Sequence, residues 1–507
     1  MHITTRVRRH SRRITLALAG CLAASVASFA VPAVAATQTV SIRDNSFTPE
    51  EVHVDPGDSV IWSFANGRNR HRVQSDERGQ FDSGEMTSGD TFTHAFDKEG
   101  YYFYYCRYHG APRGVGMSGV VIVGNPPPPD TGGGEKDERP KLVVPDDFPT
   151  IQKAVDAAKP GSTVLIKPGT YREAVTVQTP RLVIKGVDRF RTILNGDDEK
   201  GSGITVDGAN DVKVTNLTVR NYAGNGVYFV NMNGYTATKI DSIKNRTYGI
   251  YAFNSYDGVI KNSWSYGSGD GAYYIGQCLG CSGLIEHVVG TWSYLGYSGT
   301  NATGVVIRDS VFTHNAVGVA PNTLPTEELG PNRGTVVINN KIFDNNYDSI
   351  PAAGFSANPV GIPIGVGVWL PGVENNVVMY NDIRDHNSYG VLVSQSVDSD
   401  LPVNNQVMYN VIRNSDFDED GYGYDLAWDG TGESNCFSFN DFEGDTGPPD
   451  IETLYACASR PFPGAPYPPV QAHLAENVPN SQTRPQEEPP EPTRPSCQKG
   501  APGCNRH

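Results

Sequence analysis

Apolar and polar residues alternate along residues 37–123 in short stretches separated by turn residues. Val52 and Val54 stand two positions apart, as do Val60 and Trp62, with a Pro-Gly-Asp turn between the two pairs. A period of two is typical of strands with one buried face. Because the stretches together span fewer than about 90 residues, they predict a small β-sandwich.

A second pattern follows, in which glycine and apolar residues recur at a nearly constant spacing of 22 or 23 residues. The units "GITV", "GVYF", "GIYA" and "GAYY" begin at Gly203, Gly226, Gly249 and Gly271, and Gly367 and Gly390 repeat the spacing later. Each unit also holds a second apolar run that ends near an Asn. Short repeats of strands without regular Leu spacing predict a parallel β-helix, with the Asn residues paired along the stacked turns. The chain is thus predicted to be all-β.

One helix is predicted before the repeats, in "DFPTIQKAVDAAKPGSTVLIKPGTY". Thr150 can cap it by accepting a backbone N–H of the first turn. Ile151, Ala154, Val155 and Ala158 form its apolar face, and a Pro-Gly pair ends it.

Composition divides the chain into five segments. Residues 1–35 combine five Arg, no acidic residue, an apolar run and a final Ala-Val-Ala, which predicts a secretory signal peptide. The sandwich takes 36–124, a Pro- and Gly-rich linker 125–140, and the β-helix 141–460. Residues 461–507, rich in Pro, Glu and Gln, are predicted to be a disordered tail. We expect no transmembrane segment in the mature chain.

Two features of the predicted signal peptide leave alternatives open. The sequence "LAGC" ending at Cys21 resembles a lipoprotein cleavage box, but the apolar run continues past it, so we favour cleavage near Ala35. The "SRR" run resembles a twin-arginine signal, although Thr15 stands where a large apolar residue is usual. The chain is expected to be exported, as a secreted, extracellular or periplasmic protein, by either route.

Charge narrows the range of partners. The formal net charge is −15, and loss of the five Arg in residues 1–35 makes it more negative. An acidic surface disfavours nucleic acid as a partner and anionic polysaccharide as a generic one. It also keeps an exported protein soluble.

Cysteine counting indicates one thiol with a special role. Of the eight cysteines, Cys21 belongs to the signal peptide, and seven remain in an oxidising compartment. Three pairs are close in sequence and predict disulfides: Cys278 with Cys281, Cys436 with Cys457, and Cys497 with Cys504. Cys106 is left over.

The stretch "CRYHGAPRGVGM" places Cys106 in one loop with His109 and Met117. Type 1 copper binds a thiolate, two imidazoles and a weak axial thioether. The loop supplies one of each, so the second imidazole must come from elsewhere. Zinc is the alternative metal, but it rarely takes a thioether.

Three other histidines precede this loop. His53 alternates with two buried valines and is expected to face solvent, and His94 lies in a polar edge strand. His71 ends a loop rich in Gly and Asn and opens a short strand, so we predict it as the fourth ligand.

In this ligand order, residues 37–123 resemble the plastocyanin/azurin-like cupredoxins, small type 1 copper proteins with an eight-stranded Greek-key fold. The resemblance implies one copper ion held by His71, Cys106, His109 and Met117. The seven residues between His109 and Met117 exceed the four usual in plastocyanins, which puts the copper–thioether distance in question.

Residues 141 to about 445 resemble the right-handed parallel β-helix proteins of the pectin-lyase-like superfamily, whose cap matches the predicted helix and first strand. That fold carries lyases, glycosidases, epimerases and binding proteins, so it does not define an activity. Candidate catalytic residues are Asp382, Arg384, Asp385 and His386, with a second acidic group at Asp416, Asp418, Glu419, Asp420 and Asp425. A solvated acidic turn is the alternative that we favour for them.

Three functions remain open at this point. The first is an exported electron-transfer protein whose β-helix docks it to a redox partner protein, a polysaccharide or a cell surface. The second is a carbohydrate-active β-helix enzyme with an accessory copper domain. The third is copper delivery to an acceptor enzyme, which similar β-helix proteins assist.

Overall fold

The computed structural model describes residues 36–43, 46–67, 70–75, 80–111, 115–124, 140–325, 327–347, 362–415, 423–459 and 470–471. At 107–111 and 115–116 only the backbone is described. The predicted signal peptide, nearly all of the predicted linker and most of the predicted tail lie outside these residues. The chain forms two compact units, Met1–Thr131 and Gly132–His507.

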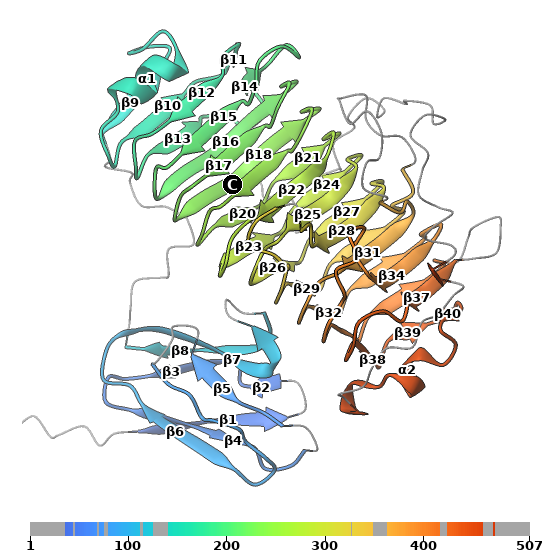
Figure 1. The fold of residues 1–507 in the computed structure, drawn as a ribbon. Helices are drawn as coiled ribbons and strands as arrows, with labels where there is room; N and C mark the ends of the chain where they lie inside the picture. Colours follow the sequence, from blue (N-terminus) through green and yellow to red (C-terminus); the bar gives the residue numbers. More distant parts are fainter. Residues whose placement is uncertain are drawn as a thin grey trace, which may run out of the picture. The chain divides into compact units, whose positions relative to one another are not determined.

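The first unit is a sandwich of two four-stranded sheets (Figure 1). One sheet has the order β2-β1-β4-β6 and the other β3-β8-β7-β5. The strands are β1 (Thr37–Arg43), β2 (Ser46–Thr48), β3 (Glu51–Val54), β4 (Ser59–Ser63), β5 (Val73–Ser75), β6 (Thr91–Ala95), β7 (Gly100–Ala111) and β8 (Val115–Val123). The predicted small sandwich is confirmed.

The alternation of the sequence accounts for the sandwich core. Val52 and Val54 of β3 and Val60 and Trp62 of β4 are buried, while the residues between them are more exposed. The Trp62 ring lies 5.5 Å from that of Phe81, so aromatic contacts fill the space between the sheets.

The second unit is a solenoid of three parallel sheets. The first sheet runs through β9 (Lys141–Val144), β10 (Thr163–Ile166), β13 (Val183–Gly186), β16 (Val212–Arg220), β18 (Tyr235–Ile243), β20 (Val259–Lys261), β23 (Gly283–Glu286), β26 (Val305–Arg308), β29 (Val336–Ile338), β32 (Val377–Met379), β35 (Gln406–Met408) and β38 (Cys436–Ser438). The long strands β16 and β18 continue into the second sheet.

The second sheet contains β11 (Gly169–Tyr171), β14 (Thr192–Asn195), the distal halves of β16 and β18, β21 (Trp264–Tyr266), β24 (Val289–Thr291), β27 (Val311–Thr313), β30 (Lys341–Phe343), β33 (Asp382–Arg384), β36 (Val411–Arg413) and β39 (Asp441–Phe442). The third sheet contains β12 (Val175–Val177), β15 (Ile204–Asp207), β17 (Val227–Val230), β19 (Ile250–Phe253), β22 (Gly271–Gly276), β25 (Leu295–Thr300), β28 (Val317–Asn322), β31 (Val366–Pro371), β34 (Tyr389–Ser394), β37 (Tyr424–Trp428) and β40 (Thr446–Gly447). This is the predicted parallel β-helix.

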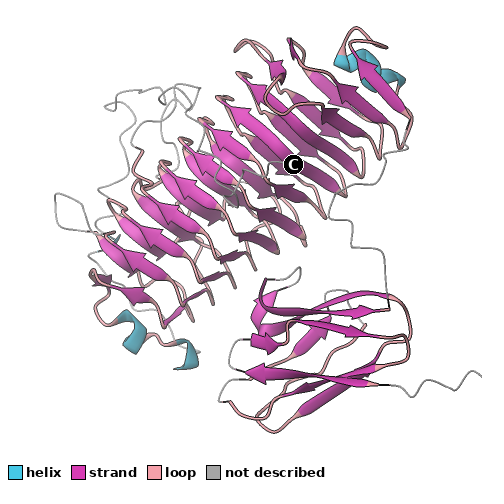
Figure 2. Cartoon of the chain, turned by 180° about the vertical axis from the view of Figure 1, so that it is seen from behind, coloured by secondary structure: helices cyan, strands magenta, loops and turns pink. Residues whose placement is uncertain are grey.

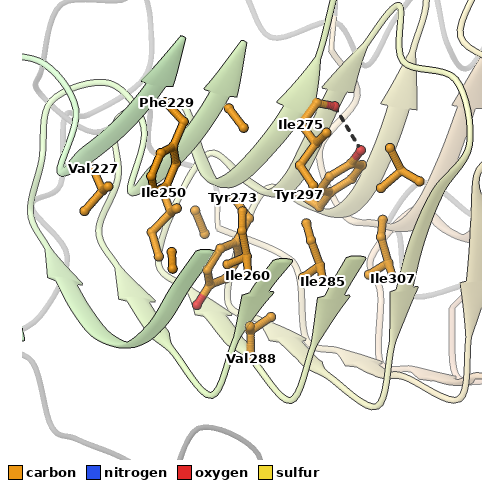
Figure 3. Close-up of a cluster of buried hydrophobic side chains, with 14 of the residues drawn as sticks. Val227, Phe229, Ile250, Ile260, Tyr273, Ile275, Ile285, Val288, Tyr297 and Ile307 are labelled. Atoms are coloured by element: carbon orange, nitrogen blue, oxygen red, sulfur yellow. Dashed lines mark hydrogen bonds between the residues drawn. The ribbon is translucent and has the colours of Figure 1, made fainter. Parts of the chain in front are cut away.

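Apolar side chains from successive coils fill the interior (Figure 3). Val227, Ile250 and Tyr273 pair in register on the third sheet and are fully buried. The Tyr273 hydroxyl donates to the Val289 carbonyl at 2.9 Å, and the Tyr297 hydroxyl donates to the Ile275 carbonyl at 3.2 Å. Buried phenols therefore keep hydrogen-bond partners inside the stack.

The predicted Asn pairing along the turns is confirmed. The backbone N–H of Asn340 donates to Oδ1 of Asn381, that of Asn381 to Oδ1 of Asn410, and that of Asn410 to Oδ1 of Asn440, each at 3.0 Å. Each Asn thereby satisfies a buried backbone donor of the preceding coil.

α1 (Ile151–Ala157) and α2 (Ile451–Leu454) lie near the two ends of the β-helix (Figure 2). The predicted helix is α1, and its N-cap Thr150 accepts from the Lys153 N–H. α2 and η1 (Cys457–Ser459) follow the last coil.

Cysteine pairing follows the prediction where it is described. Cys278 is bonded to Cys281, and Cys436 to Cys457. Cys106 forms no disulfide. The predicted Cys497–Cys504 pair lies outside the described residues.

Part of the predicted tail packs on the β-helix. Val470 is fully buried among outward-facing apolar side chains of the third sheet, including Trp369 and Leu392. The Gln471 side-chain amide donates to the Asp429 carbonyl at 3.1 Å. Val470 and Gln471 are the two residues of the predicted tail that the structure describes.

Candidate metal centre and a tyrosine–carboxylate surface

The sandwich brings two of the four predicted copper ligands together. β5 pairs antiparallel with β7, so that Val73 lies opposite Cys106, and His71 precedes β5 by two residues. The His71 Nδ1 atom lies 3.6 Å from the Cys106 Sγ atom, and both side chains are fully buried.

Backbone and ring contacts hold the imidazole in place. His71 and Met86 exchange two backbone hydrogen bonds, of 3.0 and 2.7 Å. The Phe64 ring lies edge-on to the imidazole with ring centroids 4.6 Å apart. His71 is therefore positioned before any metal binds.

The thioether belongs to the same region. Tyr105 of β7 pairs with Ser118 of β8, and the register becomes irregular between Tyr105 and Gly110. Met117 precedes Ser118, which brings it to the level of Cys106, and both belong to one buried cluster. The side chain of His109, the fourth predicted ligand, lies outside the described part of the structure.

The separation of sulfur and nitrogen suits a shared metal. Metal–sulfur and metal–imidazole distances of about 2.3 and 2.0 Å place two ligands about 3.5 to 3.8 Å apart at tetrahedral or trigonal angles. The observed 3.6 Å falls within this range. A buried thiol, imidazole and thioether form a soft donor set, which fits copper.

The other two sandwich histidines lie elsewhere. His53 is exposed and its Nε2 atom lies 2.8 Å from a Glu51 carboxylate oxygen. His94 packs between the rings of Phe81 and Phe96, and burial lowers its pKa below the ordinary value. Among the described side chains, no group of three His, Cys, Asp or Glu converges on one point.

The candidate catalytic residues of the β-helix do not form one cluster. Arg384 and Asp382 make an ion pair on the outer surface of β33, and both are substantially exposed. Asp385 accepts from the Asn414 side chain at 3.1 Å in an exposed turn. His386, in contrast, is fully buried.

His386 is a member of a buried polar ladder. Its Nδ1 atom accepts the Asn345 N–H at 3.3 Å, and its Nε2 atom lies 3.3 Å from the Ile342 carbonyl. Burial lowers the pKa of His386 to about 3, so the imidazole is neutral in the folded protein. The imidazole satisfies buried backbone groups of neighbouring coils.

The one described residue of the second acidic group is also buried and hydrogen bonded to the backbone. Asp425 is fully buried and accepts the backbone N–H groups of Ser415 at 3.0 Å and Gly444 at 2.7 Å. Asp416, Asp418, Glu419 and Asp420 lie outside the described residues.

A different polar site lies on the outer face of the third sheet and was missed from the sequence. Tyr228 of β17, Tyr251 of β19 and Tyr274 of β22 occupy equivalent positions in register. The ring centroids of Tyr228 and Tyr251 are 4.8 Å apart, and those of Tyr251 and Tyr274 4.6 Å apart. Tyr248, just before β19, stacks on Tyr251 at 4.3 Å. The repeated Tyr in "GVYF" and "GIYA" is the sequence signal.

Asp270 lies beside these rings, just before β22. The Tyr248 hydroxyl is hydrogen bonded to its carboxylate. Burial, together with the nearby negative charge of Glu327, raises the pKa of Asp270 to about 6. Burial also raises the pKa of Tyr248 and of Tyr274 well above the ordinary value.

Glu327 belongs to an inserted segment between β28 and β29, and its negative charge acts on Tyr251 and Tyr274. The Asn301 side-chain amide donates to the Leu324 carbonyl at 2.8 Å and to the Glu328 carbonyl at 3.0 Å, which fixes the loop. The Gln277 side chain donates to the Glu327 carboxylate. We call Tyr228, Tyr248, Tyr251, Tyr274, Asp270, Gln277 and Glu327 the tyrosine–carboxylate surface.

Comparison with known proteins agrees with the sandwich geometry. Residues 34–124 match the copper binding proteins of the plastocyanin/azurin family. The first unit is therefore a cupredoxin-family domain, which implies copper binding. No curated protein matches the chain.

Solved structures resemble each unit in turn. The A-module of the mannuronan C-5 epimerase AlgE4 from Azotobacter vinelandii is 16% identical over 58% of this chain and 90% of its own, with a TM-score of 0.44. An alginate lyase from Paenibacillus sp. is 14% identical over 58% of this chain and 95% of its own, with a TM-score of 0.38. A novel purple cupredoxin from Nitrosopumilus maritimus is 25% identical over 17% of this chain and 99% of its own, with a TM-score of 0.15.

Proposed function

We propose that the cupredoxin domain holds one type 1 copper ion through His71, Cys106, His109 and Met117 and that the protein exchanges single electrons with a partner protein. The observation that carries the proposal is the buried Cys106 sulfur, 3.6 Å from His71 Nδ1, in one cluster with Met117. When bound, copper supplies a one-electron redox couple at this site.

The residues of the chain prepare this site in three ways. Burial keeps water from the Cys106 sulfur and the His71 ring. The edge-on Phe64 ring fixes the orientation of the imidazole. The soft Met117 thioether favours the reduced ion, and the imidazoles keep the oxidised ion acceptable.

Electron exchange and copper delivery make opposite predictions for metal retention. The copper-loaded protein is cycled between ascorbate and ferricyanide in the presence of a Cu(I) chelator. An electron carrier retains its copper through repeated cycles, whereas a delivery protein loses copper to the chelator in the reduced state. Loss of the metal at the first reduction would replace electron transfer with delivery.

We infer that the protein acts outside the cytoplasm. The N-terminal sequence pattern and the disulfides support export. Within the described residues no helix has the length and apolar character needed to cross a membrane. Sequencing the N-terminus of the exported protein tests cleavage near Ala35; a lipid-modified Cys21 would contradict it.

Carbohydrate binding by the β-helix is the second proposed function. The tyrosine–carboxylate surface favours it, because stacked aromatic rings beside carboxylate and amide groups match the apolar faces and hydroxyls of sugars. Retention of the chain on immobilised polysaccharide tests this function. Passage of the chain through a broad set of such supports without retention would refute it.

A further inference from the structure

Two carboxylates are placed beside the tyrosines by their hydrogen bonds. The Asp270 N–H donates to the Thr247 carbonyl, next to Tyr248, at 2.9 Å, and the Glu327 carboxylate accepts from Gln277, which directly follows β22. Asp207 acts on Tyr228, while Asp270 and Glu327 act on Tyr251. Glu327 also acts on Tyr274 and on Asp270. The ionic groups that shift the pKa values of these side chains are therefore carboxylates.

This arrangement excludes one large class of sugars. A uronate bound over the tyrosines would bring its carboxylate close to Asp270 and Glu327 in a partly desolvated place. Like charges at such distances repel, and recognition of carboxylates uses Arg or Lys instead. The surface is built against anionic saccharides.

The same groups suit an uncharged saccharide. Tyr228 and Tyr251 are half-buried, so parts of their stacked rings remain accessible along the outer face of the third sheet. The hydroxyl groups of a sugar can donate to Asp270 and Glu327, while the buried Gln277 amide holds Glu327 in place. The carboxylates of Asp270 and Glu327 form a polar rim beside the stacked rings of Tyr228 and Tyr251.

The rim is built from parts distant in sequence. Glu327 comes from the inserted loop, and Gln277 ties it to the turn after β22. The Asn301 side chain accepts the Leu324 N–H at 3.1 Å and donates to the Leu324, Glu327 and Glu328 carbonyls. These bonds anchor Leu324, Glu327 and Glu328, so the Glu327 carboxylate is held beside Gln277 before any ligand arrives.

We propose that the tyrosine–carboxylate surface binds a saccharide that carries no anionic group, with a sugar ring against the accessible parts of Tyr228 and Tyr251 and its hydroxyls on Asp270 and Glu327. This inference rests on the second proposed function. It adds the substrate class, and it rejects polyuronates as ligands.

The test measures binding of the full copper-loaded chain to matched oligosaccharides by calorimetry. Neutral β-linked gluco-, manno- and N-acetylglucosamine oligomers form one set, and oligogalacturonate and oligomannuronate of equal length form the other. We expect at least one neutral oligomer to bind, with every uronate at least tenfold weaker. Tighter binding of a uronate overturns this inference and leaves carbohydrate binding standing. Failure of both sets to bind overturns the second proposed function itself.

Variants locate the site. Tyr251→Ala and Asp270→Asn should each weaken binding of the neutral oligomer at least tenfold. Tyr409→Ala is the matched control, because Tyr409 stacks with Tyr380 and Phe439 at a distant turn of the β-helix. Tyr251→Phe preserves the ring and should keep most of the affinity, even if Tyr251→Ala unfolds. Unchanged affinity in folded Asp270→Asn, or equal loss in Tyr409→Ala, contradicts the proposed location.

Discussion

Replacing His386 with Asn should remove a specific acid sensitivity of the β-helix. In the folded protein Nδ1 accepts the Asn345 N–H, and Nε2 lies 3.3 Å from the Ile342 carbonyl. If Nδ1 were protonated, its N–H would face the Asn345 N–H, so two hydrogen-bond donors would lie opposite each other in a buried site. This contact agrees with the pKa of about 3 that burial gives His386.

The size and sign of the effect follow from linkage. The folded pKa of about 3 lies below the ordinary value of 6.5, so the neutral imidazole contributes stability that is complete above pH 6.5 and is lost as the pH falls towards 3. At 1.36 kcal/mol per pH unit, the loss is about 2 kcal/mol at pH 5. Asn in place of His386 retains an acceptor for Asn345, as Asn345 itself does for Asn315. The smaller side chain costs about 1 kcal/mol at neutral pH.

Urea unfolding of the full chain at pH 7.5 and pH 5, followed by far-ultraviolet circular dichroism, measures this difference. The wild type should lose about 2 kcal/mol more than His386→Asn between the two pH values. His287→Asn, which changes an exposed histidine, should follow the wild type. Equal pH dependence in wild type and His386→Asn would refute the buried, neutral imidazole.

Two further stability predictions concern charged pairs and a partly buried acid. Arg189→Met should destabilise the protein by about 3–5 kcal/mol in urea unfolding, because it leaves the buried Asp241 carboxylate without the Arg189 contact of 2.8 Å. Arg384→Ala, which removes the exposed pair with Asp382, should cost less than about 1 kcal/mol, and equal losses in the two variants would contradict the burial argument. Asp270→Asn should stabilise the protein by about 2–3 kcal/mol at pH 8 and have little effect at pH 4, since the raised pKa of Asp270 makes its ionised form costly in the folded state. A stability change in Asp270→Asn that does not depend on pH would refute that argument.

The repeat pattern was sufficient to predict the parallel β-helix, because each coil places the same residue types at the same turns. It did not give the strand register. The repeat pattern aligns Gly249 with Gly271, an offset of 22 residues. In the structure Tyr251 pairs with Tyr274, an offset of 23 residues. The shift by one residue turns Tyr273 inward and Tyr274 outward. Which side chains of a strand point inward depends on how they pack, and the spacing of the repeats does not define this.

The two candidate sites differ in how far the sequence predicted them. Cys106 stood out through cysteine counting, and His71 through its loop, so the buried pair was expected. Asp270 was hidden, because it lies in a Gly- and Ser-rich turn and its neighbour Glu327 belongs to an insertion. The sequence did not separate His386 from its neighbours: Asp382 and Arg384 lie on the outer surface, while the His386 side chain is buried.

The proposed copper site requires that Cys106 bind the metal as a thiolate together with His71. Visible absorption of the chain loaded with one equivalent of Cu(II) tests it directly. We predict an intense thiolate-to-copper band that disappears in Cys106→Ser and persists in His53→Ala, since His53 is exposed and its Nε2 atom lies beside Glu51. A wild-type protein that holds a full equivalent of Cu(II) without this band would contradict the account.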